Sequence, residues 1–207
     1  MQEIEAKFFV QNLKNIEMRL HSLEAHLIQE RVLETNIRFD LPDNRLRSEG
    51  RVLRLRQDSE AKFTYKGAGK NNQGILSRTE IEFIVGDFEK AKSFLEALGY
   101  QSIFYYEKYR TTYDINACHV MLDELPYGNF VEIEGDSVKT IKKISDTLNL
   151  NWDTAIATSY NSLFEHVCAK RPGFNSTNLS FSALNGLSFT AADLSVRAAD
   201  DQQQNNP

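Results

Sequence analysis

The chain begins with a strict alternation of apolar and charged side chains. In the stretch EIEAKF, residues 3–8, apolar side chains alternate with Glu3, Glu5 and Lys7. A period of two predicts a β-strand, because successive side chains of a strand point to opposite faces. One face of this strand is therefore apolar, and the other carries two carboxylates and an ammonium. A half-solvated strand of any antiparallel sheet shows the same pattern, so its meaning depends on whether other strands repeat it.

Seven further segments have the strand pattern, and their connections are mostly short enough for antiparallel pairing. They are residues 30–43, 51–57, 61–67, 75–85, 101–115, 119–125 and 129–135. Apolar residues at spacings of three and four predict four amphipathic helices. These helices are expected within residues 12–29, 86–100, 137–150 and 153–170. The Gly- and Asn-rich stretch 66–74 is expected to be a loop.

Most of the predicted strands gather their charged side chains on one face, and both signs of charge occur there. The positions after the first strand are Arg54, Arg56, Lys62, Lys66, Arg78, Glu80, Glu82, Lys108, Arg110, Asp123, Glu132 and Glu134. Eight antiparallel strands are enough to close a barrel. If the charged faces point inward, facing cations and anions line the lumen, and the helices cover the apolar outer face. We therefore predict an α+β fold, a closed eight-stranded antiparallel β-barrel with flanking helices.

A charged lumen points to a ligand, because buried ion pairs often stabilise a fold no better than apolar packing does. Lys and Arg clusters suit phosphate groups. Carboxylate clusters suit hard divalent cations such as magnesium or manganese. Together they suit a metal-bound polyphosphate, whose non-bridging oxygens the cations neutralise.

The overall charge and composition narrow the partners. A net charge of −5 argues against a broadly basic nucleic-acid-binding surface. No apolar run approaches the roughly 20 residues that cross a bilayer, and the charged first strand is unlike a secretory signal. Cys118 and Cys168 lie far apart and require no disulfide. We expect a cytoplasmic protein that binds neither nucleic acid nor a membrane.

The composition changes after Lys170. Residues 171–207 are rich in Ser, Asn, Ala and Gln, charge is sparse, and the periodicity is weak. We predict one folded domain over residues 1–170, followed by a polar tail over residues 171–207 that is disordered or loosely attached.

The strand motifs occur in an order that resembles a known family. EIEAK resembles the ExExK signature of the CYTH superfamily, the triphosphate tunnel metalloenzymes, and the resemblance runs from about residue 2 to residue 170. The later motifs are NIRFDLPD, RVLRLR, TYKG, SRTEIE, EKYRTTY and DELPYGNFVEIEG. The runs LGYQSIFYYEKYRTTY and LDELPYGNFVEIEG are similar to those of the class IV adenylate cyclases. The resemblance implies the same eight-stranded barrel, with a triphosphate tunnel as its lumen.

The resemblance also implies roles for individual residues. The signature residues Glu3, Glu5 and Lys7 are expected to be catalytic. Metal binding, with Mg²⁺ or Mn²⁺, is expected at Glu3, Glu5, Asp123, Glu132 and Glu134. Triphosphate binding is expected at Lys7, Arg54, Arg56, Lys66, Arg78, Lys108 and Arg110. Glu80 and Glu82 are expected to be supporting acids that bind metal or orient the cations. Arg38 stands where many members have an aromatic residue, and is left outside the core site as a rim residue. Tyr160 is expected either in the core or at the tunnel mouth.

Three functions fit these residues. In a class IV adenylate cyclase-like enzyme, the 3′-hydroxyl of ATP attacks the α-phosphorus, and cyclic AMP and pyrophosphate form. In a triphosphatase, water attacks the terminal phosphorus of thiamine triphosphate, a nucleoside triphosphate or tripolyphosphate. In a non-catalytic module, the tunnel only binds polyphosphate or a nucleotide. The cyclase-like reaction is favoured by the similarity of the motifs. The family is often dimeric, so a homodimer stays open.

Overall fold

The computed structural model describes residues 2–72 and 75–201, without the side chains of residues 2, 3, 71, 72, 75 and 76. In these ranges, ten strands form one sheet. They are β1 (Gln2–Val10), β2 (His26–Asp40), β3 (Val52–Gln57), β4 (Ala61–Lys66), β5 (Lys70–Asn72), β6 (Ile75–Val85), β7 (Gln101–Ile115), β8 (Cys118–Leu125), β9 (Gly128–Gly135) and β10 (Asn178–Leu179). The helices are α1 (Leu13–Ser22), α2 (Arg45–Ser48), α3 (Phe88–Ala97), α4 (Val138–Thr147) and α5 (Tyr160–Lys170), with a 3₁₀ turn at Trp152–Thr154.

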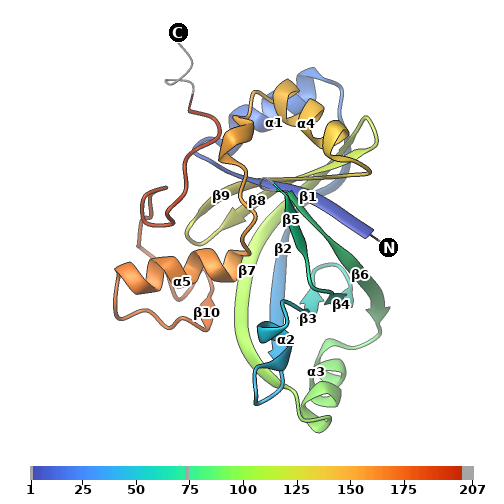
Figure 1. Ribbon diagram of the computed structural model, residues 1–207, viewed down its shortest axis with the longest axis vertical. Helices are drawn as coiled ribbons and strands as arrows, with labels where there is room; N and C mark the ends of the chain where they lie inside the picture. Colours follow the sequence, from blue (N-terminus) through green and yellow to red (C-terminus); the bar gives the residue numbers. More distant parts are fainter. Residues whose placement is uncertain (1, 73–74, 202–207) are drawn as a thin grey trace.

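The pairings of the sheet close in a ring (Figure 1). The strand order β1–β9–β8–β7–β2–β3–β4–β6 returns to β1, because β1 pairs with both β9 and β6. Each of these pairings is antiparallel. Strand β5 extends the sheet beside β6, and β10 adds a short parallel pair to β7. The fold is therefore of the mixed α+β class, with a sheet that closes on itself.

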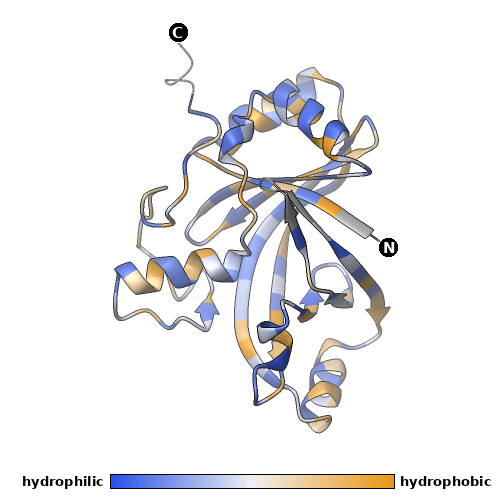
Figure 2. Cartoon of the chain, viewed as in Figure 1, coloured by the Kyte–Doolittle hydropathy of each residue, from blue (hydrophilic) through white to orange (hydrophobic). Residues whose placement is uncertain are grey.

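The register places the charged positions of neighbouring strands beside each other. Glu5 lies opposite Glu134, and Lys7 lies opposite Glu132, in the pairing of β1 with β9. Residues directly opposite in an antiparallel pair project to the same face. The alternation of apolar and polar residues predicted along the strands is visible in the coloured ribbon (Figure 2). The charged faces of separate strands thus form one continuous inner surface.

The helices cover the apolar outer faces of the ring, as predicted. Helices α1 and α4 lie together over β1, β8 and β9, where Ile16 and Ile141 are fully buried (Figure 1). Helix α5 packs against β7, β8 and β9 through Phe164. Helix α3 covers part of β2 and β3 through Leu95. The apolar core therefore lies outside the ring, which leaves its interior to polar side chains. Within the described ranges, no helix has the length and apolar character that a membrane span requires.

Three boundaries differ from the predictions. The first helix ends at Ser22 instead of near residue 29, because Glu24 takes a left-handed conformation (φ 56°) and β2 begins at His26 to pair with β7. The last helix begins at Tyr160 instead of near residue 153, with Ser159 as its N-cap. The predicted loop contains the short strand β5, which gains its hydrogen bonds from β6. In each case a long-range pairing or cap overrides the local pattern.

The C-terminal segment also differs from the prediction. Residues 171–201 pack against the rest of the chain, contrary to the expectation of a disordered or loosely attached tail. Leu179, Leu184 and Leu194 are buried against α5 and its neighbours. Asp200 accepts hydrogen bonds from the backbone of residues 11 and 12 at 2.9–3.0 Å, next to the start of α1. The apolar residues of this segment are too widely spaced to show a period, and only the folded surface supplies their partners. Residues 202–207 lie outside the described ranges.

Candidate functional site

A cavity of about 1200 Å³ lies within the ring, and nearly half of the residues that line it are charged. Eleven Lys and Arg residues and seven Asp and Glu residues of the described ranges line it. The cations are Lys7, Arg38, Arg47, Arg51, Arg54, Arg56, Lys62, Lys66, Arg78, Lys108 and Arg110. The acids are Glu5, Glu34, Asp58, Glu80, Glu82, Glu132 and Glu134. A chain of net charge −5 therefore surrounds a cavity with an excess of positive side chains.

The predicted site residues come together on this surface, with two exceptions. All seven cations predicted to bind triphosphate line the cavity, and so do Glu5, Glu80, Glu82, Glu132 and Glu134. Asp123 lies behind the cavity wall and is fully buried. Glu3 is on β1, but its side chain lies outside the described residues. Their predicted roles stay predictions, while the clustering itself is a feature of the structure.

Asp123 is the centre of a buried ionic network. Its carboxylate accepts hydrogen bonds from Lys108 Nζ at 3.0 Å and from Arg110 Nε and Nη2, both at 2.6 Å. The phenol of Tyr160 donates to the same carboxylate at 2.8 Å. Burial and the negative charge of Asp123 raise the pKa of Tyr160 well above its usual value, so this phenol stays protonated. These contacts are those of a residue that positions two cations, and the predicted metal role of Asp123 stays a prediction.

Lys7 and Glu132 form a second buried pair beside this network. Lys7 Nζ lies 3.1 Å from Glu132 Oε1 and 4.2 Å above the ring of Tyr160. Burial opposes ionisation of Lys7, but Glu132 and Glu5 more than offset it and raise the pKa of Lys7. Burial likewise opposes ionisation of Glu132, but Lys7 and Arg110 lower its pKa well below the usual value. Both groups are therefore charged, and Glu132 serves here as the counter-ion of two cations.

Glu34 is a buried acid of the same cavity that the strand pattern did not identify. It lies 3.7 Å from Lys108 Nζ and 3.9 Å from both Arg56 and Arg110. Burial would raise the pKa of Glu34, but these cations, Lys108 first, lower it to about 2. Glu34 is 1% exposed and is therefore an ionised, inaccessible counter-ion. Glu34, Asn36 and Arg38 alternate along β2 and therefore share one face of the strand, and this spacing could have identified Glu34 from the sequence.

The wall formed by β3, β4 and β6 holds the next group of cations. Arg56 Nη2 donates to Glu82 at 2.9 Å, and Thr64 Oγ1 donates to the same carboxylate at 2.8 Å. Arg54 donates to the phenol oxygen of Tyr106 at 3.2 Å. Burial opposes ionisation of this phenol, but Arg54 and Lys108 more than offset it and lower the pKa of Tyr106. Glu82 is expected either to bind metal or to orient the cations, and in this structure it pairs with Arg56.

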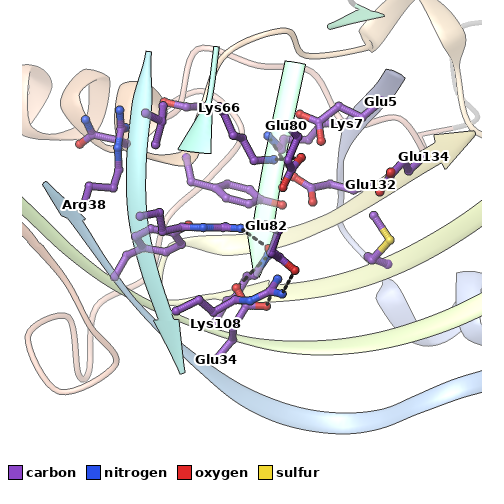
Figure 3. A pocket seen from close by; sticks show the side chains of 18 of the residues that line it. Glu5, Lys7, Glu34, Arg38, Lys66, Glu80, Glu82, Lys108, Glu132 and Glu134 are labelled. Atoms are coloured by element: carbon purple, nitrogen blue, oxygen red, sulfur yellow. Dashed lines mark hydrogen bonds and ion pairs between the residues drawn. The ribbon is translucent and has the colours of Figure 1, made fainter. Parts of the chain in front are cut away.

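Carboxylates gather at the other side of the cavity, around β1 and β9. Glu5 and Glu134 are direct cross-strand partners, and both are labelled on the same side of the pocket in Figure 3. Like charges in this position are destabilising unless a cation joins them. Arg78 supplies one cation, 3.5 Å from Glu5, and Lys66 pairs with Glu80 at 3.1 Å. Carboxylate oxygens are the donors that magnesium and manganese prefer. Among the described side chains, no three Asp, Glu, His or Cys groups are close enough to make a metal site by themselves.

Two residues left open by the sequence take definite positions. Tyr160 both belongs to the apolar core around α5 and lines the cavity, with its ring beneath Lys7. Arg38 lines the cavity, although the sequence motif leaves it outside the core site. In Figure 3 it lies on the side of the pocket away from Glu5 and Glu134. The local sequence pattern does not show whether a residue near the rim reaches the cavity, and for Arg38 this is decided by the closed sheet.

Two curated relatives are similar over much of the chain. One is a candidate adenylate cyclase from Methanocaldococcus jannaschii, 26% identical over 171 residues, which cover 77% of this chain and 97% of the relative. The other is the adenylate cyclase CyaB from Aeromonas hydrophila, 28% identical over 135 residues, which cover 63% of this chain and 67% of the relative.

Solved structures share the fold at low sequence identity. A candidate adenylate cyclase from Vibrio parahaemolyticus superposes with a TM-score of 0.69 at 21% identity, over 76% of this chain and 94% of its own. A candidate adenylyl cyclase from Hippeastrum, described as having a dominant triphosphatase activity, superposes with a TM-score of 0.60 at 16% identity, over 79% and 95% of the two chains. The CYTH domain model matches residues 1–151, well over half of the sequence. The chain therefore belongs to the CYTH domain family.

Proposed function

We propose that this protein is a metal-dependent enzyme that holds a triphosphate in the cavity of its closed sheet, and that it converts ATP to cyclic AMP and pyrophosphate. The observation that carries the proposal is the lining of the cavity, where eleven cations face seven acids. An organic phosphate with several negative charges is the ligand that such a surface attracts. The two curated relatives named as adenylate cyclases support the reaction.

The cations would hold the phosphate groups through their own charge and geometry. Arg54, Arg56 and Lys66 approach from the β3–β4 wall, while Lys108 and Arg110 approach from β7. Arginine forks bind phosphate oxygens with two parallel hydrogen bonds, and a lysine acts as a point charge. The buried acids Asp123, Glu34 and Glu132 contact Lys108, Arg110 and Arg56, and they keep these three side chains in place before a ligand arrives.

The acids at the β1–β9 side fit a divalent cation. Glu5 and Glu134 are opposite each other in the pairing of β1 with β9, and Glu3 comes two residues before Glu5 in the sequence of β1. We propose that these three residues hold Mg²⁺ or Mn²⁺ and that Glu132 contributes by fixing Lys7. When bound, the metal supplies charge neutralisation and activation of the attacking oxygen. The chain's own residues bind the phosphates, orient them and keep water from the deep side of the cavity.

The size of the cavity favours a nucleotide over inorganic tripolyphosphate. Pockets for small organic ligands commonly measure about 300–1,000 Å³. A volume of about 1200 Å³ leaves room for a base and a sugar beside the phosphates. A cyclase needs that room, because the ribose 3′-hydroxyl must reach the α-phosphorus with the pyrophosphate group in line.

The second candidate is hydrolysis of a triphosphate, with water in place of the 3′-hydroxyl. The fold shared with the Hippeastrum protein, which is described with a dominant triphosphatase activity, supports keeping this candidate. Thiamine triphosphate, nucleoside triphosphates and tripolyphosphate are the substrates to compare. A non-catalytic polyphosphate- or nucleotide-binding module is the third candidate. The cytoplasmic location and the lack of a nucleic-acid partner stay predictions, and the question of a homodimer stays open.

The first experiment is incubation with ATP, thiamine triphosphate or tripolyphosphate, with Mg²⁺ or Mn²⁺, followed by chromatography of the products. Cyclic AMP and pyrophosphate support the cyclase. Orthophosphate and a diphosphate, without a cyclic nucleotide, assign hydrolysis instead. In Glu5→Gln we expect at least a hundredfold loss of turnover with the fold retained, because the metal loses a charged ligand. Full turnover of this variant at limiting metal would refute the proposed metal site.

A further inference from the structure

Arg38 differs from the other cations of the cavity. Ten of the eleven Lys and Arg residues that line it have a carboxylate within 4.0 Å in the described part of the chain, and Arg38 has none. Its Nε atom is buried without a hydrogen-bond partner. A buried polar atom that the protein leaves unsatisfied costs stability, and a site that binds a ligand is one explanation for it.

The surroundings of Arg38 are positive. It lies directly opposite Arg54 in the pairing of β2 with β3. Burial lowers the pKa of Arg38, and the charges of Arg47, Arg54 and Arg78 lower it further, so that together they outweigh the opposing effect of the Tyr106 phenol. The ionised guanidinium of Arg38 has no carboxylate partner among the described residues. An anion bound here would offset the repulsion between Arg38 and the neighbouring arginines, and it would accept the hydrogen bond that Nε leaves unmade.

The position of Arg47 is built into the fold. The buried carboxylate of Asp40 accepts hydrogen bonds from the backbone N–H groups of Leu46 and Arg47, both at 2.9 Å. These bonds hold the short helix α2 at the cavity, and Glu165 of α5 holds the Arg47 side chain at 2.6 Å. Asp40 therefore fixes the backbone of Arg47, and Glu165 pairs with its half-exposed side chain.

Unsatisfied donors continue along the same wall. Among the described residues, four buried arginine Nε atoms lack a hydrogen-bond partner, and they belong to Arg38, Arg51, Arg54 and Arg56. All four residues line the cavity. Arg54 and Arg56 are among the cations assigned above to the triphosphate. Arg38 extends this row across to β2, on the side away from the carboxylates Glu5 and Glu134 (Figure 3).

We propose that Arg38, supported by Arg47 and Arg54, forms an additional anion subsite that binds a fourth phosphate group, linked to the triphosphate. This inference rests on the proposed function, because the first three phosphates must occupy the neighbouring cations. The fourth phosphate can be the end of a linear chain, as in tetrapolyphosphate, or a phosphate on the organic group, as in adenosine 3′-phosphate 5′-triphosphate. In both, a terminal phosphate group meets a guanidinium that has no carboxylate within 4.0 Å among the described residues.

The test is calorimetric binding to the full chain at constant ionic strength and constant free Mg²⁺. Four ligands are compared: tripolyphosphate, tetrapolyphosphate, ATP and adenosine 3′-phosphate 5′-triphosphate. We expect at least one ligand with a fourth phosphate to bind about tenfold tighter than its parent, since one charge-assisted contact is worth about that factor. The ligand that shows the gain identifies whether the phosphate belongs to a linear chain or to the organic group.

The decisive variant is Arg38→Gln, which should lose the tenfold gain and keep tripolyphosphate binding within about threefold. Arg38→Lys should keep part of the gain, because the charge remains. The matched control is Arg45→Gln, since Arg45 is an exposed arginine of α2 that pairs with Asp43 and does not line the cavity. It should leave all four affinities unchanged. Because Arg38 pairs with no carboxylate in the described part of the chain, Arg38→Gln should also unfold at the same or a higher urea concentration.

Two results would overturn the subsite. One is equal affinity of the wild type for each parent ligand and its four-phosphate derivative. The other is an equal loss of tripolyphosphate and tetrapolyphosphate binding in Arg38→Gln, which would make Arg38 part of the triphosphate site. A wild type that binds none of the four ligands would refute the proposed function itself, so the two failures are distinguishable.

Discussion

The buried network around Asp123 makes a quantitative prediction about stability. Asp123→Asn keeps the volume of the side chain but removes the charge that Lys108 and Arg110 share at 2.6–3.0 Å. Lys108 is 2% exposed and would be left with Glu34 at 3.7 Å as its remaining acid. Breaking one side of a buried ion pair costs about 3–5 kcal/mol, because the other charge stays buried. We therefore expect the free energy of unfolding to fall by that amount.

The measurement is urea unfolding in a metal-free buffer with a chelator, followed by far-ultraviolet circular dichroism and by the fluorescence of Trp152, the single tryptophan. Asp146→Asn is the matched control. Asp146 lies on the exposed surface of α4, 2.9 Å from Lys142 four residues earlier, and an exposed pair of this kind contributes little. The control should unfold at the same urea concentration as the wild type.

A loss of less than about 1 kcal/mol in Asp123→Asn would refute this reasoning, because a positioning role requires the charge in the absence of metal. If Asp123→Asn were less stable than the wild type only in samples that contain metal, Asp123 would act as a metal ligand, as the family resemblance implies. The two roles are separable because the buried network exists before any ligand binds.

Two further predictions address Glu34 and the C-terminal segment. The folded pKa of Glu34 is lowered from 4.5 to about 2, so the stabilisation from its ionised form is present above pH 4.5 and is lost as the pH falls toward 2. Urea unfolding of the wild type at several pH values should show a loss of about 3 kcal/mol over this range. The loss should be smaller in Glu34→Gln. A wild-type profile that Glu34→Gln leaves unchanged would contradict this assignment. Leu179→Ala should destabilise the protein by about 2–4 kcal/mol, because Leu179 is fully buried against α5, whereas Leu187→Ala, at a position 45% exposed in the same segment, should change thermal stability by less than about 0.5 kcal/mol. Equal effects of the two leucine variants would show that residues 171–201 do not pack as described.

The spacing of charges along the strands predicts much of the site. Seven cations and five acids assigned from the strand pattern and the family resemblance line one cavity. This is possible because the direction of a strand side chain depends only on the local backbone, with a period of two. The same rule separates Glu5 and Lys7 from Ala6 and Phe8, which are fully buried on the outer face.

Other features depend on contacts between distant parts of the chain. Asp123 has the same local pattern as a cavity residue, yet it lies behind the wall because Lys108, Arg110 and Tyr160 converge on it from β7 and α5. Arg38 belongs to the cavity because β2 pairs with β3 and β7 along its length. The leucines of residues 171–201 are buried because α5 and β7 offer them an apolar surface.

The sequence by itself determined which face of each strand is charged and that cations and acids would meet on that face. The tertiary structure decided which charges pair, which are buried beyond reach of a ligand, and which guanidinium, among the described residues that line the cavity, has no carboxylate partner. The physical reason is one of range. Side-chain direction is a property of neighbouring residues, whereas burial and ion pairing are properties of groups that only the closed sheet brings within a few ångströms.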